Sequence, residues 1–238
     1  MVFAGSGLLQ PQSTSRVEYN HDSGNVNLSY DGSSVAFVAT DRTHSSPFLF
    51  YQKPPESAVL NANTVEMSAR YVTVVDWRTM MHIVGLGVSG PGAKIRTAVI
   101  GTPSRTNAPL PDFLGYSGRA SIRGGIRASA TPQFSDISGG SQIVTWSYTP
   151  SNNHLSGFIS LYIVENLTQY QRGLLRASGQ FDRATNSISG TLSDPENGFE
   201  GTFRGQIFGP NRDELAIVFE FSRASDRSSY VGHYIGRR

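Results

Sequence analysis

Residues 205–221, GQIFGPNRDELAIVFEF, consist of two strand-like runs separated by the turn residues Gly209, Pro210 and Asn211. Side chains two positions apart in a strand lie on the same face of the sheet. In the second run one face carries only large apolar residues, namely Leu215, Ile217, Phe219 and Phe221. The stretch therefore predicts a β-hairpin in a sheet with one buried face.

Six further connections, several of them short and turn-like, lie between position 115 and the last residues. Together with the turn of this hairpin they separate eight strand-like runs, at 115–128, 142–149, 155–164, 174–182, 187–192, 199–208, 214–221 and 230–235. Short, turn-rich connections favour antiparallel neighbours, and an up-and-down barrel is the simplest way to close eight such strands. The fold class expected is therefore all-β, with an eight-stranded antiparallel barrel in the second half.

The two faces of these strands differ in polarity. Opposite the apolar positions lie polar ones, which are Glu200, Thr202, Arg204 and Gln206 in one strand and Arg176, Ser178, Gln180 and Asp182 in another. Such an outer face is incompatible with lipid, since charge at the bilayer midplane costs about 2 to 4 kcal/mol for Arg or Lys. The alternation of Phe with Gly on the inner face predicts a filled apolar interior rather than a ligand cavity.

The first half predicts a smaller β-rich domain. Residues 8–22 are polar, and 1–22 are expected to form a flexible leader. Residues 23–110 are expected to form the domain itself, and 111–238 the barrel. Asp31-Gly32 marks a hairpin within 25–40, and strands are expected at 71–77, 80–84 and 95–100. Residues 41–62, interrupted by three prolines, are expected to form an aromatic loop.

The barrel half resembles the C-terminal barrel of transferrin-binding protein B and its relatives. In that family the penultimate hairpin carries Gly-x-Phe-x-Gly followed by Pro-x-x-x-Glu-Leu, and the corresponding residues here are Gly205, Phe208, Gly209, Pro210, Glu214 and Leu215. The start of the barrel and the last strand are also similar, through Gly101, Pro103, Pro111, Gly115, Tyr116, Gly118 and Ala120 and through residues 232–238. The resemblance implies an N-terminal handle domain followed by the barrel.

Composition argues against several function classes. The formal net charge is only +2, and the arginines are scattered rather than clustered, so a nucleic-acid surface is not expected. There is no cysteine, which removes disulfides and thiolate metal sites, and no apolar run approaches the ~20 residues of a membrane span. No spacing of the five histidines or of serine points to a zinc site or a catalytic triad, so an enzyme is not expected.

Candidate ligand-binding residues lie in the first half. His44 stands close to the aromatic run that contains Phe48, Phe50 and Tyr51, as an axial haem ligand beside an apolar platform would, and His82 is a second candidate. A solvated loop histidine and a core histidine are the alternatives, and Tyr51 can ligate iron or simply pack. No other metal site is expected.

The resemblance implies binding rather than turnover. Family members are found at the Gram-negative cell surface, often as lipoproteins, or are secreted, and they capture a host iron source for an outer-membrane receptor after passage through export machinery. In small haemophilin-like members, loops of the handle hold haem. The resemblance therefore implies a ligand-capture protein for haem or another iron source. A surface module that binds a host protein without a cofactor is the alternative.

Overall fold

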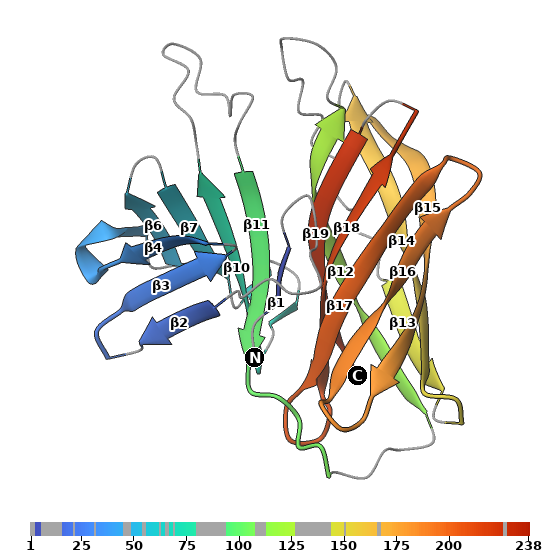
Figure 1. The fold of residues 1–238 in the computed structure, drawn as a ribbon, viewed down its shortest axis with the longest axis horizontal. Coiled ribbons are helices and arrows are strands. Elements are labelled where there is room, and N and C mark those ends of the chain that lie inside the picture. Colours follow the sequence, from blue (N-terminus) through green and yellow to red (C-terminus); the bar gives the residue numbers. More distant parts are fainter. Residues whose placement is uncertain are drawn as a thin grey trace.

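The computed structural model describes residues 3–5, 16–20, 22–30, 32–44, 49–53, 56–61, 63–64, 67–68, 70–79, 94–107, 113–126, 144–149, 151–165, 168–225 and 228–238. Its β-strands form two units that lie side by side, a barrel and a smaller handle (Figure 1). The expected all-β class is confirmed. In the part of the chain that is described, no helix is long and apolar enough to cross a membrane.

The barrel is closed and antiparallel, as the sequence predicts. Each strand pairs with the next one in the chain, and the last strand pairs with the first. The strands are β12 (Leu114–Ile126), β13 (Val144–Thr149), β14 (His154–Glu165), β15 (Thr168–Asp182), β16 (Ser187–Asp194), β17 (Phe199–Phe208), β18 (Glu214–Arg223) and β19 (Ser228–Arg237). All eight expected strands are thus present.

The hairpin predicted from residues 205–221 is formed by β17 and β18. Gly205 lies opposite Ile217, and Ile207 lies opposite Leu215, so the apolar faces of the two strands coincide. In the turn, Gly209 has a φ of 84° and Arg212 a φ of 62°. A positive φ is accessible to glycine at little cost, which explains the glycine at the start of this turn.

Aromatic side chains fill the barrel interior. One continuous apolar cluster contains inward residues of all eight strands, from Leu114 to Tyr234. Trp146 belongs to this cluster, and its ring lies 5.1 Å from that of Phe203 in an edge-to-face arrangement. Gly157 faces the Trp146 indole so closely that a Cβ atom there would lie 2.5 Å from the ring. Large side chains therefore fit the narrow interior because glycines face them.

The handle is built on a six-stranded antiparallel sheet. In spatial order its strands are β1 (Phe3–Gly5), β11 (Lys94–Gly101), β10 (Val72–Thr79), β7 (Glu56–Asn61), β6 (Leu49–Lys53) and β5 (Arg42–His44). Three of these strands, β5, β6 and β7, lie within 41–62, where the sequence predicts an aromatic loop. The pairing of β6 with both neighbours satisfies backbone groups that a buried loop would leave unpaired.

The handle also contains a three-stranded sheet. It consists of β2 (Arg16–Asn20), β3 (Asn25–Tyr30) and β4 (Ser33–Phe37), and β3 and β4 form the predicted Asp-Gly hairpin, with Gly32 at a φ of 76°. Val26, Leu28 and Phe37 are its buried side chains. The one-turn 3-10 helix η1 (Ala39–Asp41) follows, and a two-stranded ladder joins β8 (Asn63–Thr64) to β9 (Met67–Ser68).

Residues 1–22, expected to be a flexible leader, include two strands. Phe3–Gly5 pairs with β11, and Arg16–Asn20 pairs with β3. The partner of Phe3–Gly5 lies far along the chain, so the local sequence does not indicate it. Arg16–Asn20 forms a hairpin with the next strand, which the alternation of Val17 and Tyr19 with polar residues indicates only weakly. The expected strand at 80–84 lies outside the described residues.

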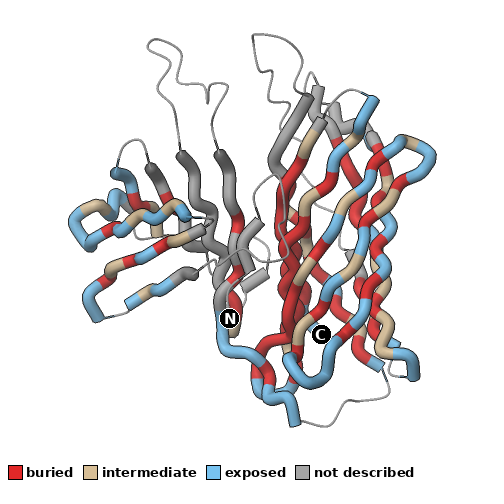
Figure 2. The backbone as a smooth tube through the Cα atoms, viewed as in Figure 1, coloured by how far each residue is buried: buried red, intermediate tan, exposed pale blue. Residues whose placement is uncertain are grey.

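The handle packs on the outer face of β18 and β19. Strand β11 contacts both of them, and β1 contacts β18. The apolar side chains of this joint are Val72, Val99, Phe208, Ala216, Val218 and Ile235, with Tyr71 packed against them. Figure 2 shows these barrel strands buried where they face the handle. The outer face of the barrel is therefore solvent-exposed only on the strands away from the joint.

One residue expected on the exposed outer face of β17 is buried. Glu200 and Thr202 are exposed, but Gln206 is only 2 % exposed. The linker after β11 runs alongside this end of the strand, where Pro103 bridges Phe208 and the Ser104 N–H donates to the Ile207 carbonyl at 3.0 Å. The linker thus covers a part of the outer face that the alternation of polar and apolar residues in β17 predicts to be solvent-exposed.

Candidate ligand-binding site on the handle

The predicted ligand residues fall on the β5–β6 edge of the handle. His44 ends β5, and the backbone register pairs it with Phe50 in β6. Phe50 is half-buried, and Tyr51 follows it on the other face of the strand. Phe48 and His82 lie outside the described residues. The structure therefore brings His44 and Phe50 together in the backbone but not the full predicted set.

Tyr51 is part of the handle core. Its side chain is fully buried, its hydroxyl donates to the Gly24 carbonyl at 2.8 Å, and its ring lies 5.8 Å from that of Phe37. Burial is the main cause that raises the pKa of Tyr51 above the ordinary value of a tyrosine, followed by the nearby Tyr19. A protonated hydroxyl held by a backbone carbonyl cannot ligate iron until that bond breaks.

The turn between the two handle sheets presents an apolar side chain that sequence reasoning did not single out. Val38 is 45 % exposed, while Phe37 beside it is fully buried. Asp41 holds the turn, because its carboxylate accepts the Val38 N–H at 2.9 Å and its own N–H donates to the Val38 carbonyl at 2.9 Å. Among the described handle residues Val38 is the large apolar side chain that is exposed. The second valine in the run Val-Ala-Phe-Val marks this position in the sequence.

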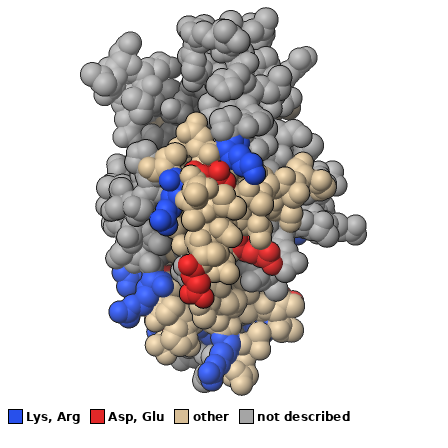
Figure 3. Space-filling view, turned by 90° about the vertical axis from the view of Figure 1, so that its left-hand side faces the viewer, with Lys and Arg blue, Asp and Glu red and all other residues tan. Residues whose placement is uncertain are grey.

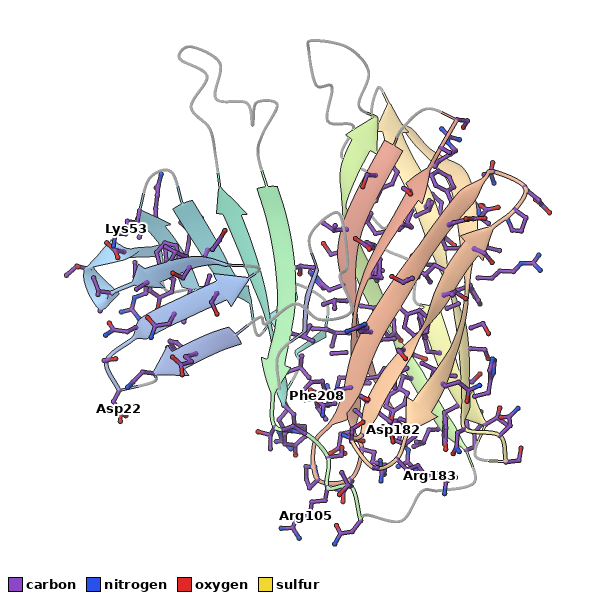
Figure 4. The ribbon with its side chains drawn as sticks, viewed as in Figure 1. Asp22, Lys53, Arg105, Asp182, Arg183 and Phe208 are labelled. Carbon is purple, nitrogen blue, oxygen red and sulfur yellow. The ribbon has the colours of Figure 1, made fainter. Side chains whose placement is uncertain are left out.

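The outer side of the handle carries charges of both signs. Glu18, Asp22, Arg42 and Lys53 are exposed, and Asp41 is half-buried. Figure 3 shows this side with blue and red side chains set among uncharged surface. In Figure 4, Asp22 and Lys53 lie on the side of the handle away from the barrel, whereas Arg105, Asp182 and Arg183 lie at the base of the barrel. A mixed surface of this kind suits a protein partner better than a polyanion.

The described residues do not form a metal site. No group of three or more His, Cys, Asp or Glu side chains in this part of the chain is close enough to hold an ion. Two described histidines outside the handle edge, His154 and His233, have other neighbours. His233 is buried in the joint, with Nδ1 3.3 Å from the Thr97 hydroxyl, and His154 lies 3.0 Å from the Ser178 hydroxyl on the barrel.

Comparison with solved structures agrees with this architecture. Transferrin-binding protein B of Neisseria meningitidis serogroup B matches with a TM-score of 0.53 and 14% identity, over 89% of this chain and 39% of that one. A mutant of transferrin-binding protein B of Haemophilus parasuis matches with a TM-score of 0.53 and 13% identity, over 99% and 44%. The chain has the fold of a transferrin-binding protein B lobe.

This lobe-like chain spans about two fifths of the length of the transferrin-binding proteins it matches. No protein-family model matches its sequence, and no curated protein matches it either. The likeness to transferrin-binding protein B is therefore a likeness of fold.

Proposed function

We propose that this chain is a non-catalytic capture protein at the outer surface of a Gram-negative bacterium, and that it binds a host iron-carrying protein through its handle. The shared fold supports this proposal, because the solved proteins of this fold are named for binding transferrin. An outer-membrane receptor that accepts the captured iron source is part of the same proposal.

The observation that carries the proposal is the packing of the barrel. Its interior is one continuous cluster of buried side chains, and one of its outer faces is used by the joint. A ligand must therefore bind to an outer surface. The handle provides one far from the barrel, with exposed Val38 beside charges of both signs. Apolar anchors surrounded by a polar rim are typical of protein–protein interfaces.

Haem is the second candidate ligand, and the pairing of His44 with Phe50 favours it. If haem is the ligand, we propose His44 as its axial ligand and Phe48, Phe50 and His82 as residues that line it. Tyr51 supports β6 from the core instead of touching iron, because its hydroxyl is bound to Gly24. Haem binding needs an apolar slot with a ligand at one side, whereas a protein partner needs a wide surface.

Binding to transferrin, iron-loaded and iron-free, tests the first candidate. We expect Val38→Lys to weaken binding by 1 kcal/mol or more, about fivefold, as loss of an interface anchor does. Phe158→Lys is the matched control, since Phe158 is 44 % exposed on β14 of the barrel. Equal affinity of wild type and both variants would show that the handle turn is not the contact. Absence of binding to either form of transferrin would refute this ligand.

A haemin titration followed by the haem absorption band tests the second candidate. A one-to-one end point for the wild type supports haem as the ligand. Weaker haemin binding and a shifted absorption band in His44→Ala support His44 as the axial ligand. His154→Ala is the control, because His154 lies on the barrel, and it is expected to leave the spectrum unchanged. His233 is unsuitable as a control because it is buried in the joint. Identical spectra for wild type and His44→Ala would contradict the assignment of the ligand.

A further inference from the structure

Glu214 is a barrel residue whose carboxylate is bound by the handle. Its side chain is fully buried at the start of β18. One carboxylate oxygen accepts the N–H of Arg70 at 2.6 Å, and the other accepts the N–H of Tyr71 at 2.9 Å. Both donors immediately precede β10 in the handle sheet. Hydrogen bonds to an ionised acceptor are shorter and stronger than neutral ones, so this is a strong two-point contact.

The contact belongs to a network that includes the linker. The Tyr71 carbonyl accepts the Thr102 N–H at 3.0 Å, and the Thr102 carbonyl accepts the Gly209 N–H at 2.9 Å. The Ser104 hydroxyl donates to the Gly209 carbonyl at 2.6 Å. Hydrogen bonds thus join three segments, which are the residues before β10, the linker after β11 and the turn before β18.

The family-like residues of this hairpin are placed at the same joint. Phe208 is fully buried in its apolar part. Gly209 has a positive φ, and a Cβ atom there would lie 2.6 Å from the Asp213 carboxylate and 2.7 Å from the Tyr71 ring, so a larger residue would collide with both the turn and the handle. Figure 4 shows Phe208 at the base of the molecule, between the handle and the barrel. None of these residues lies on the outer side of the handle.

We propose that Glu214 is a positioning residue that sets the orientation of the handle on the barrel. The apolar part of the joint is non-directional, since burial depends on area and not on angle. The paired oxygens of one carboxylate, in contrast, accept two adjacent N–H groups in one orientation. Turning the handle while the apolar joint stays closed would leave a buried carboxylate and two donors unpaired, which is unfavourable. The recognisable sequence of residues 205–215 then encodes a joint between units, whatever ligand the handle takes.

Distance measurements between spin labels test this without any ligand. The chain has no cysteine, so Ser34→Cys on the handle and Glu200→Cys on the barrel, both exposed, give one label in each unit. We expect one narrow distance distribution in this doubly labelled protein. Glu214→Gln should broaden and shift it, because the amide retains one acceptor but places an NH₂ group against a backbone N–H. Glu214→Ala should broaden it further.

Glu196→Gln is the matched control, because Glu196 is exposed in the turn at the far end of β16, and its distribution should equal that of the parent. Far-UV circular dichroism shows whether each variant is folded. If Glu214→Ala does not fold, the distance distribution of Glu214→Gln alone tests the proposal. A Glu214→Gln protein with the parent distribution and a lower unfolding temperature alone would overturn the proposal, because Glu214 would then only add stability.

Discussion

At the scale of single residues, the barrel core consists of large rings facing glycines. Trp146 lies against Gly157, and the Phe203 ring lies where Cβ atoms at Gly179 and Gly190 would be 2.6 and 2.7 Å away. Packing at this density leaves no room for an added methyl group. The alternation of Phe with Gly in the sequence already predicts a filled interior, but it does not identify which glycine faces which ring.

Gly157→Ala tests this packing. Replacing glycine by alanine in an unstrained strand is usually neutral or stabilising, but here the methyl group would overlap the Trp146 indole. We expect the free energy of unfolding to fall by about 1–3 kcal/mol, as in other overpacked cores. Urea unfolding followed by far-UV circular dichroism measures it, with Ser156→Ala, on the outer face of the same strand, as the control. A Gly157→Ala protein as stable as this control would disprove tight packing at the indole.

At the scale of elements, β18 is buried on both faces. Leu215, Ile217 and Phe219 face the barrel interior, whereas Ala216 and Val218 face the handle. The uninterrupted apolar run from Leu215 to Phe219 is the sequence signal for such a strand. The two-residue alternation of apolar side chains predicts only the buried inner face. The burial of the outer face, where the handle packs, is indicated instead by the unbroken apolar run.

Val218→Asn tests the outer face of β18. An amide buried in the joint without a partner would lower the free energy of unfolding by about 1–3 kcal/mol. Thr202→Asn on the exposed outer face of β17 is the control, and its effect should stay within about 0.5 kcal/mol. Thermal unfolding of the two variants compares them. Equal loss in both would mean that the handle does not cover β18.

The barrel was predictable from the sequence and much of the handle was not. From β13 onward each barrel strand pairs with the next one in the chain through a short connection, so local alternation reveals these strands. The handle sheet instead joins β1 to β11 and β10 to β7, across long stretches of sequence. For the candidate site, the β5–β6 region was indicated by its aromatic residues, but neither the burial of Tyr51 nor the exposure of Val38 follows from residue type.

At the scale of the whole molecule, buried tyrosines link the fold to alkaline pH. The Tyr234 hydroxyl donates to the Tyr116 carbonyl at 2.9 Å, and the Tyr116 hydroxyl donates to the Arg212 carbonyl at 3.0 Å. Burial is the main cause that raises the pKa of both tyrosines well above the usual range. In the unfolded chain they ionise at about pH 10.

A raised pKa means that the folded state keeps protons that the unfolded state releases. The stability from these tyrosines is therefore fully present below about pH 10 and decreases as the pH rises beyond it. In a titration of phenolate absorbance we expect the buried hydroxyls to ionise only together with loss of the fold. Tyr116→Phe should reduce the dependence of stability on alkaline pH. Ionisation of all ten tyrosines near pH 10 in a folded protein would contradict this prediction.

The most direct test of ligand capture by the handle is a hydrogen-exchange footprint of the chain with and without transferrin. The predicted result is slower exchange of backbone amides in η1, β5 and β6, around Val38 and the β5–β6 hairpin, with unchanged exchange in the outer barrel strands β14, β15 and β16. Protection of those barrel strands with none on the handle, or no protection anywhere, would contradict capture of this partner by the handle.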